Sequence, residues 1–266
     1  MASYKPVTAV LRGLVVLRAV SVQRRASVKS IQALTKINRP TVIRMLETLE
    51  HAGFIIRETS PGHYLVTGKA LELSMGFEMS SALAAAAQCV IEALQRKIGW
   101  PSDVGVFDTD AMVVAATNRS SEGRFFYDRR PGYRAPLLGT SLGLAYIAFT
   151  TEEEREAAFA SLRSSADPWN EIARDRDRAV ELLRVIRKTG YATTDLRYTQ
   201  REYDGKVISF GVPIMNGTRP MGALNVTYLR EALTRAEAEK RLLPPLKKAA
   251  TDISANLTLG TKSTAR

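Results

Sequence analysis

The side chains that most often carry out catalysis are scarce in this chain of 266 residues. Its two histidines, His51 and His63, both lie in the first quarter, and its one cysteine is Cys89. A nucleophilic triad or a tetrahedral zinc site in the rest of the chain would need a histidine or further cysteines there. Neither a Walker-type phosphate loop nor a GxGxxG motif follows a predicted strand. We therefore predict no catalytic residues, no metal and no cofactor, and we assign Cys89 to packing; catalysis by carboxylates alone stays open.

Positive charge is concentrated at the start of the chain. Residues 1–66 contain ten Lys and Arg against three Glu, which is +7 of the total net charge of +11. The other 200 residues carry 28 basic and 24 acidic side chains. A compact domain with such an excess suits a polyanion, because the release of condensed counterions from phosphates drives binding. The first quarter of the chain therefore predicts a nucleic-acid partner.

Apolar spacing predicts three helices within residues 1–53. Each helix follows a residue that can cap it, namely Thr8, Ser27 and Asn38. The apolar positions are Val10, Leu11, Leu14 and Leu17, then Val28, Ile31 and Leu34, and then Val42, Met45, Leu46 and Leu49. Residues 35–38 form a tight turn, and Gly53 suits the end of the third helix. This pattern predicts a helix-turn-helix.

The third helix presents polar side chains opposite its apolar stripe. Recognition helices place such N-terminal residues against base edges, so Arg44 could pair with a guanine and Thr41 could contact a phosphate or a thymine methyl group. Two extended runs, Phe54–Arg57 and His63–Val66, surround a Pro-Gly turn and predict a wing that places Arg57 on DNA. The predicted DNA-binding residues are Asn38, Arg39, Pro40, Thr41, Arg44 and Arg57. The alternative is a three-helix packing unit with a solvated basic face.

The remaining residues alternate between helical and extended patterns. We expect helices over 80–97, 139–149, 151–163 and 175–189, strands over 103–107, 112–117, 125–127, 206–215 and 221–228, and a last helix over 230–257 that bends or breaks at Pro244–Pro245. Asn216–Gly217 is a strong hairpin signal. This order predicts an α+β fold with an antiparallel sheet, followed by a polar, disordered tail over 260–266.

Several stretches resemble the IclR family of bacterial transcriptional regulators across essentially the whole chain. They are the run Val7–Leu17, INRPTVIRMLETLEHAGFI at 37–55, HYLVTGKALELS at 63–74, PLLGTSLGLAYIAF at 136–149 and VISFGVPIMNGTRPMGALNVTY at 207–228. The resemblance implies a winged helix-turn-helix joined by a helix to a GAF-like α/β effector-binding domain. The expected boundaries are a DNA-binding domain over 1–66, a linker helix over 67–79, an effector-binding domain over 80–260 and a disordered tail over 261–266.

The resemblance also implies an effector site between the loop that leads into the TSLGLA helix and the last strands. Carried over by position, the effector-binding residues are Ser141, Leu142, Ser209, Asn225 and Thr227, with an apolar wall of Phe107, Met112, Phe126 and Tyr127. A helix N-terminus at Thr140–Ser141 suits a carboxylate. Core packing is the alternative for each aromatic residue. Some family members carry a metal or a cysteine in this domain, but Ser209 occupies the matching strand here.

Within the family, WPSDVGVFDTDAMVV at 100–114 is most similar to the activators of 3-(3-hydroxyphenyl)propionate catabolism. We therefore expect a cytoplasmic regulator of an aromatic-acid catabolic operon. Its expected partners are double-stranded operator DNA, a hydroxyphenylpropionate-like or hydroxybenzoate-like acid, a second copy in a homodimer or dimer of dimers, and RNA polymerase if it is an activator. No apolar run approaches the length of about 20 residues that crosses a membrane.

Three alternatives to this interpretation stay open at the level of the sequence. The first is a repressor of the same family that responds to a short-chain organic acid. The second is an enzyme with a helix-turn-helix appendage, which the missing histidines disfavour. The third is an architectural DNA-binding protein whose effector domain has lost its ligand.

Overall fold

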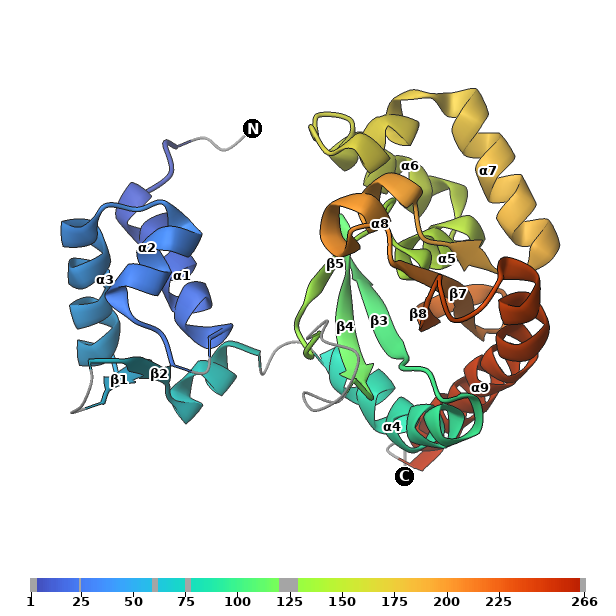
Figure 1. Ribbon diagram of the computed structural model, residues 1–266, viewed down its shortest axis with the longest axis horizontal. Coiled ribbons are helices and arrows are strands. Elements are labelled where there is room, and N and C mark those ends of the chain that lie inside the picture. Colours follow the sequence, from blue (N-terminus) through green and yellow to red (C-terminus); the bar gives the residue numbers. More distant parts are fainter. Residues whose placement is uncertain (1–3, 24, 59–61, 75–77, 120–128, 264–266) are drawn as a thin grey trace. The chain divides into compact units, whose positions relative to one another are not determined.

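The computed structural model describes residues 4–23, 25–58, 62–74, 78–119 and 129–263 (Figure 1). The chain folds as two compact units, Met1–Phe77 and Glu78–Arg266. The predicted α+β class, with a helical first domain and an antiparallel sheet in the second, is confirmed. The predicted strand at 125–127 lies outside the described residues.

The first unit packs three helices against a two-stranded antiparallel hairpin. Its elements are α1 (Thr8–Ser21), α2 (Val28–Thr35), α3 (Arg39–His51), β1 (Ile55–Arg57), β2 (Tyr64–Val66) and the 3-10 helix η1 (Gly68–Ser74). The Ser27 side chain caps α2 within a capping box, and the Asn38 side chain caps α3. Gly53, with a φ of +79°, follows α3 as predicted. Helix α1 differs, because Val7 precedes it without a side-chain cap and Thr8 is its first residue.

Only some of the apolar positions predicted for α1 and α2 are buried. Val10, Leu11 and Leu14 are each more than half exposed, as is Leu34 in α2. The buried residues of α1 are instead Val16, Leu17, Ala19 and Val20, which pack with α2, α3 and the hairpin. Helix α1 carries apolar residues on more than one face, so spacing alone could not identify the face that packs. No described residue of the first unit covers the apolar side chains in the first two turns of α1.

The second unit is built on a six-stranded, fully antiparallel sheet. In spatial order its strands are β5 (Arg134–Pro136), β4 (Ala111–Thr117), β3 (Asp103–Asp108), β8 (Arg219–Leu229), β7 (Val207–Asn216) and β6 (Ala192–Thr193). One face packs against α4 (Glu78–Ile98) and α9 (Arg235–Ser263). The other face packs against α5 (Ser141–Phe149), with α6 (Glu152–Leu162), η2 (Pro168–Arg174), α7 (Arg176–Thr189) and α8 (Leu196–Tyr203) on that side (Figure 1).

Helix α5 lies unusually close to the centre of the sheet. A Cβ atom on Gly211 of β7 would stand 2.1 Å from the Ser141 carbonyl oxygen, far inside van der Waals contact. Glycine at this position therefore allows the first turn of α5 to rest directly on β7. This contact places the N-terminus of α5 beside the strand positions that carry Ser209 and Gly211.

Several predicted elements needed correction. Helix α9 continues through Pro244–Pro245 without interruption and includes residues 260–263 of the predicted tail. Its residues on both sides of the prolines, such as Leu242 and Leu246, are buried, so packing on the sheet supports the helix across the prolines. Cys89 is exposed rather than a packing residue. Helices η2 and α8 and strand β6 occupy segments without a predicted element.

Candidate functional site

The predicted DNA-binding residues share the start of α3 and the hairpin. Arg39, Pro40 and Arg44 are exposed, and Thr41 is half-buried. Asn38 is committed to the helix cap, because its Oδ1 accepts a hydrogen bond of 3.0 Å from the Thr41 backbone N–H. Arg57 is exposed in β1, with its guanidinium carbon 5.9 Å from the centre of the Tyr64 ring.

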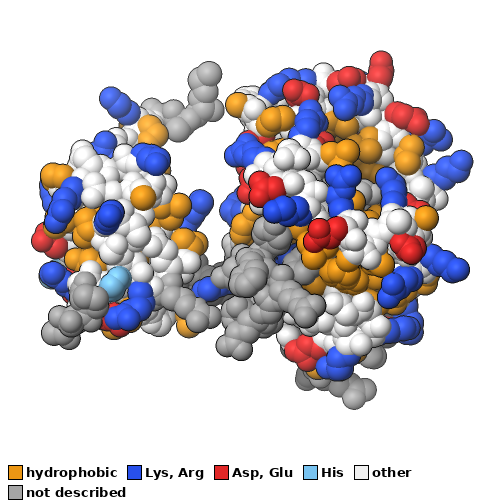
Figure 2. Space-filling view, in the orientation of Figure 1, with side chains coloured by type: hydrophobic (Ala, Val, Ile, Leu, Met, Phe, Trp, Pro, Cys, Tyr) orange, Lys and Arg blue, Asp and Glu red, His pale blue; other side chains and the backbone are white. Residues whose placement is uncertain are grey.

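The basic charge of the first unit is largely unneutralised. In the part of this unit that the structure describes, the ion pair between Arg25 and Glu58 is the only one (side chains 53% and 29% exposed), and Arg25 Nε donates to Glu58 Oε2 at 2.8 Å. It ties the segment before α2 to the hairpin, where Ala26 also pairs with Tyr64. The other described Lys and Arg side chains of α1, α2 and α3 are exposed, namely Arg12, Arg18, Lys29, Arg39 and Arg44. Positive charge is therefore exposed on all three helices, and Figure 2 shows Lys and Arg side chains spread over the visible face of this unit.

A buried ion pair lies on the α5 face of the sheet in the second unit. Arg119 Nε and Nη2 donate to the two carboxylate oxygens of Asp103, each at 2.8 Å. The side chains of Arg119 and Asp103 are 4% and 0% exposed. Burial raises the pKa of Asp103, but the Arg119 guanidinium outweighs this effect and brings the pKa to about 2. Asp103 is therefore ionised at neutral pH.

Three of the predicted effector-binding residues join this ion pair. Thr227 Oγ1 accepts from Arg119 at 2.8 Å and lies 2.8 Å from Ser209 Oγ on the paired strand. Asn225 Oδ1 accepts a hydrogen bond of 2.8 Å from the Asp103 backbone N–H. The structure thus brings Ser209, Asn225 and Thr227 into one polar network. Neither Asp103 nor Arg119 was among the residues predicted from the sequence.

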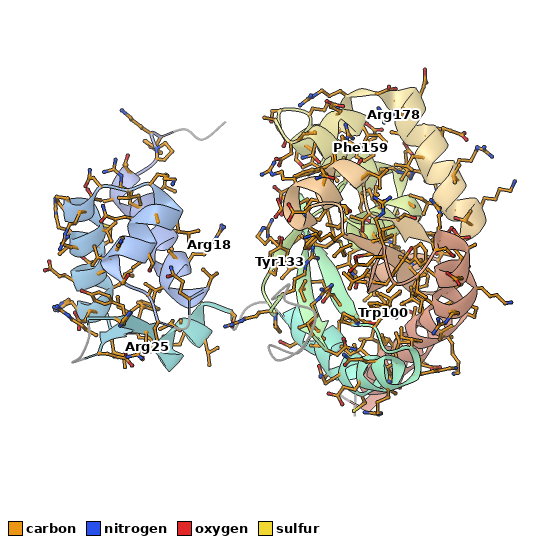
Figure 3. All side chains as sticks on the ribbon, in the orientation of Figure 1. Arg18, Arg25, Trp100, Tyr133, Phe159 and Arg178 are labelled. Carbon is orange, nitrogen blue, oxygen red and sulfur yellow. The ribbon has the colours of Figure 1, made fainter. Side chains whose placement is uncertain are left out.

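A second buried arginine lies near this network. Arg129 is 6% exposed and donates to the Tyr198 hydroxyl group at 3.0 Å and to that of Tyr203. Its guanidinium carbon lies 4.9 Å from the centre of the Tyr133 ring, which Figure 3 labels. The charge of Arg129 also lowers the pKa of Asp103, so the two clusters share one electrostatic environment. Its Nε atom has no hydrogen-bond partner in the described structure.

The other predicted effector-binding residues differ in their burial and in their partners. Met112 and Leu142 are fully buried in the apolar cluster under α5, and Phe107 is half-buried and stacked on Tyr146 with a centroid distance of 5.0 Å. Ser141 is buried, and its Oγ atom has no partner among the described residues. Phe126 and Tyr127 lie outside the described residues.

The described arrangement can bind and orient an anion more readily than it can transfer a proton. Arg129 Nε and Ser141 Oγ are buried hydrogen-bonding groups without partners in the described part of the chain, and such groups in a folded protein call for a ligand or ordered water. Among the described residues no three His, Cys, Asp or Glu side chains are grouped to hold a metal ion. None of the described helices is both long and apolar enough to span a membrane.

Comparisons with known proteins match both units of the chain. Residues 9–58 match the IclR helix-turn-helix domain, and residues 79–255 match the domain described as bacterial transcriptional regulator IclR C-terminal. The Pca regulon regulatory protein of Pseudomonas putida is 26% identical over 251 residues, which cover 92% of this chain and 82% of that protein.

Solved structures show the same fold. An IclR-family regulator from Brucella abortus is 25% identical, with a TM-score of 0.61 and coverage of 94% of this chain and 93% of that one. An IclR homologue from Microbacterium hydrocarbonoxydans, solved with 4-hydroxybenzoate, has a TM-score of 0.67 at 19% identity, with coverage of 94% and 99%. At that identity the second match establishes the fold alone.

Proposed function

The chain belongs to the IclR family of bacterial transcriptional regulators, and we propose that it controls an aromatic-acid catabolic operon in response to a hydroxylated aromatic acid. The observation that carries the proposal is the buried Arg129, which is surrounded by Tyr133, Tyr198 and Tyr203 and whose Nε has no partner among the described residues. The relative that controls the Pca regulon and the homologue solved with 4-hydroxybenzoate support this choice of ligand. We propose ligand binding rather than turnover at this site.

Arg129 would pair with the carboxylate of the effector. A buried guanidinium is costly unless its donors are satisfied, so an entering carboxylate would stabilise the domain as well as bind to it. The phenol rings of Tyr133 and Tyr198 would provide aromatic surface and hydroxyl groups that suit a hydroxylated ring. Ser141, Ser209 and Thr227 would supply further polar contacts, with Met112, Leu142 and Phe107 behind them. The subfamily of hydroxyphenylpropionate-responsive activators fits this chemistry.

The first unit would bind operator DNA through α3 and the wing. We propose that Arg44, Arg39 and Thr41 read the major groove and that Arg57 contacts the backbone or the minor groove. Asn38 and Pro40 would act by fixing the start of the helix. The exposure of these arginines and the scarcity of acidic neighbours support the assignment. Such DNA binding would take place in the cytoplasm.

A second copy of the chain would cover the exposed apolar face of α1. Five large apolar residues at the start of the chain are between 45% and 65% exposed, namely Val7, Val10, Leu11, Leu14 and Val15. Contiguous apolar surface of this kind marks interaction sites. A homodimer, alone or paired with another dimer, would match a palindromic operator. If the regulator is an activator, RNA polymerase is its further partner.

Ligand binding can be tested with the full-length protein by thermal unfolding and calorimetry. We would compare 4-hydroxybenzoate and 3-(3-hydroxyphenyl)propionate with pyruvate and other short-chain acids. An acid at 100 times its dissociation constant should stabilise the protein by about 2.7 kcal/mol. Loss of that shift in Arg129→Met, with an unchanged fold by circular dichroism, would support the site. A shift with short-chain acids alone would favour a regulator of short-chain metabolism, and aromatic binding that survives in Arg129→Met would remove Arg129 from the site.

A further inference from the structure

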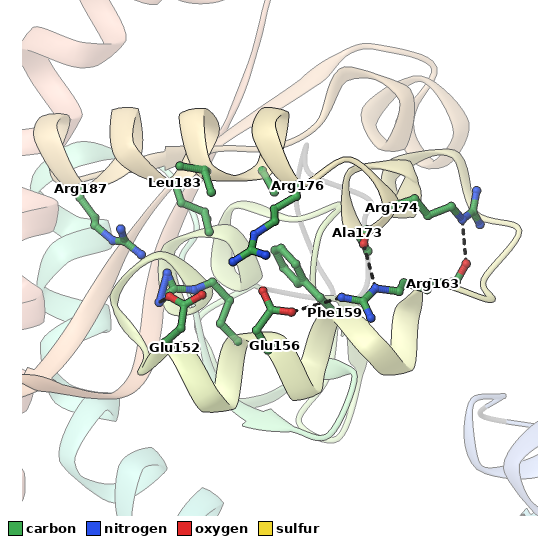
Figure 4. Close-up of a pocket in the computed structure, with 12 residues that line it drawn as sticks. Glu152, Glu156, Phe159, Arg163, Ala173, Arg174, Arg176, Leu183 and Arg187 are labelled. Atoms are coloured by element: carbon green, nitrogen blue, oxygen red, sulfur yellow. Dashed lines mark hydrogen bonds and ion pairs between the residues drawn. The ribbon is translucent and has the colours of Figure 1, made fainter.

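A pocket that shares no residue with the predicted effector site lies between α6, η2 and α7 (Figure 4). Its volume of about 380 Å³ lies within the range of small-molecule sites. Its floor is apolar and includes Phe159 and Leu183, which are 5% and 3% exposed. Its polar lining consists of two glutamates and five arginines, namely Arg155, Arg163, Arg174, Arg176 and Arg187. The lining therefore carries an excess of three positive charges.

Arg155 is the buried member of this set and is only partly satisfied. It is 8% exposed, and its Nη2 lies 3.1 Å from Glu152 Oε2 and 3.3 Å from the Thr150 carbonyl oxygen. Its Nε atom is buried and has no hydrogen-bond partner within the described structure. An unpaired donor on a buried guanidinium raises the free energy of the folded state. An anion in the pocket could accept from this donor and remove that cost.

The other arginines differ in how far they are paired. Arg163 pairs with Glu156 at 3.2 Å, and Arg174 donates to the Arg163 carbonyl oxygen at 2.7 Å. Arg187 donates to the Ala148 carbonyl oxygen, and burial together with repulsion from Arg155 lowers the pKa of Arg187. Arg176 has no ion pair or side-chain hydrogen bond among the described residues, and Figure 4 shows it reaching from α7 over Phe159. Glu152 and Glu156 therefore neutralise part of this positive charge, and Arg176 is left without a carboxylate partner among the described residues.

We propose that this pocket binds a small organic phosphate, as a second ligand site of the regulator. The phosphate would lie between Arg155, Arg176 and Arg187, because the planar guanidinium fork matches phosphate oxygens and is always charged. A dianion also neutralises more of the threefold excess of charge than a monocarboxylate does. The organic part of the ligand would lie on Phe159 and Leu183. Through this pocket the regulator would respond to phosphorylated metabolites as well as to the effector.

The proposal can be tested by calorimetry on the full-length protein with inorganic pyrophosphate as the probe. Citrate, at the same ionic strength, is the polycarboxylate with which pyrophosphate is compared. We expect saturable binding of pyrophosphate at one site per chain, and a dissociation constant raised on the order of tenfold in Arg176→Ala, because a charge-assisted hydrogen bond is lost. The matched control is Arg178→Ala, which removes the same charge from the same helix at a residue outside the pocket lining (Figure 3). Its dissociation constant should stay within about twofold of the wild type.

Four results would overturn the proposal. One is the absence of saturable binding in the wild type. Another is equal weakening in Arg176→Ala and Arg178→Ala, which would show general attraction by a basic surface. Binding of citrate in place of pyrophosphate would assign the pocket to a polycarboxylate. Displacement of pyrophosphate by an acidic peptide that depends on Arg176 would assign it to a protein partner. Arg155→Met, checked for folding by circular dichroism, provides a second variant in which pyrophosphate binding should be lost.

Discussion

Replacement of Arg119 by methionine tests the buried ion pair under the candidate effector site. Arg119→Met keeps most of the length of the side chain but removes both hydrogen bonds to Asp103 and the one to Thr227. Asp103 is fully buried, so its carboxylate would lose its main counter-charge without gaining water. Removal of one partner from a buried pair typically costs about 3–5 kcal/mol.

The same substitution should reverse the sign of the Asp103 pKa shift. Burial raises this pKa and Arg119 is the largest opposing influence, so without Arg119 the pKa should rise above its ordinary value of 3.8. The loss of stability should then be smaller at pH 4 than at pH 7, because protonation removes the buried charge. The matched control is Arg134→Met, whose ion pair with Asp108 is exposed (46% and 35%) and should contribute at most about 1 kcal/mol.

Urea unfolding at pH 7 and pH 4, followed by circular dichroism, measures both effects. The double variant Asp103→Leu with Arg119→Met should recover part of the stability, because it leaves no unpaired charge. A loss below about 1 kcal/mol in Arg119→Met would show that water or another cation reaches Asp103, and would refute the reasoning. So would a double variant whose loss equals the sum of the two single losses.

Three further predictions concern the wild-type protein and single substitutions. Asp103 has a pKa lowered from 3.8 to about 2, so it contributes roughly 2 kcal/mol of stability above pH 4 that is lost as the pH falls toward 2; the Asp103→Asn variant should lack this part of an acid-denaturation profile. Gly211→Ala would press a Cβ atom against the Ser141 carbonyl oxygen, and should cost at least about 1–3 kcal/mol in urea unfolding, whereas Gly68→Ala, with open space around it, should cost little. Arg44→Ala should weaken operator binding by about 1–3 kcal/mol in a titration by fluorescence anisotropy, and an equal loss on random DNA would instead identify a phosphate contact.

Local signals predicted the elements whose ends are fixed by particular residues. Ser27 and Asn38 cap α2 and α3 as expected, and Asn216–Gly217 joins β7 to β8, with Gly217 at a φ of +59°. Helix α8 was not predicted, because its sequence is mainly polar and it buries chiefly Tyr198 and Thr199. Such a helix forms through its tertiary contacts rather than through a repeating apolar stripe.

The residues of the candidate site also differ in whether their contacts could be predicted from the sequence. Ser209 and Thr227 could be brought together from the hairpin register, because their strands are adjacent and joined by a recognisable turn. The pairing of Asp103 with Arg119 could not be predicted, since it depends on how the chain continues after the end of β4. One signal was available, because an aspartate that begins an apolar strand is a costly residue to bury without a partner. Arg129 and Arg155 carried no sequence signal of burial.

Among the described residues of the second unit, three buried arginines differ in how their donors are satisfied. Arg119 is matched by a buried carboxylate of the chain, whereas Arg129 and Arg155 each retain a buried Nε without a partner in the described structure. A buried donor without an acceptor is unfavourable, so these two Nε groups lower stability until an acceptor arrives. An anionic ligand at either arginine would accept a hydrogen bond from that Nε. Removal of this unfavourable term would add to the affinity of the ligand. Arg119 therefore stabilises the fold through Asp103, and we propose Arg129 and Arg155 as the positions at which the domain responds to a small anion.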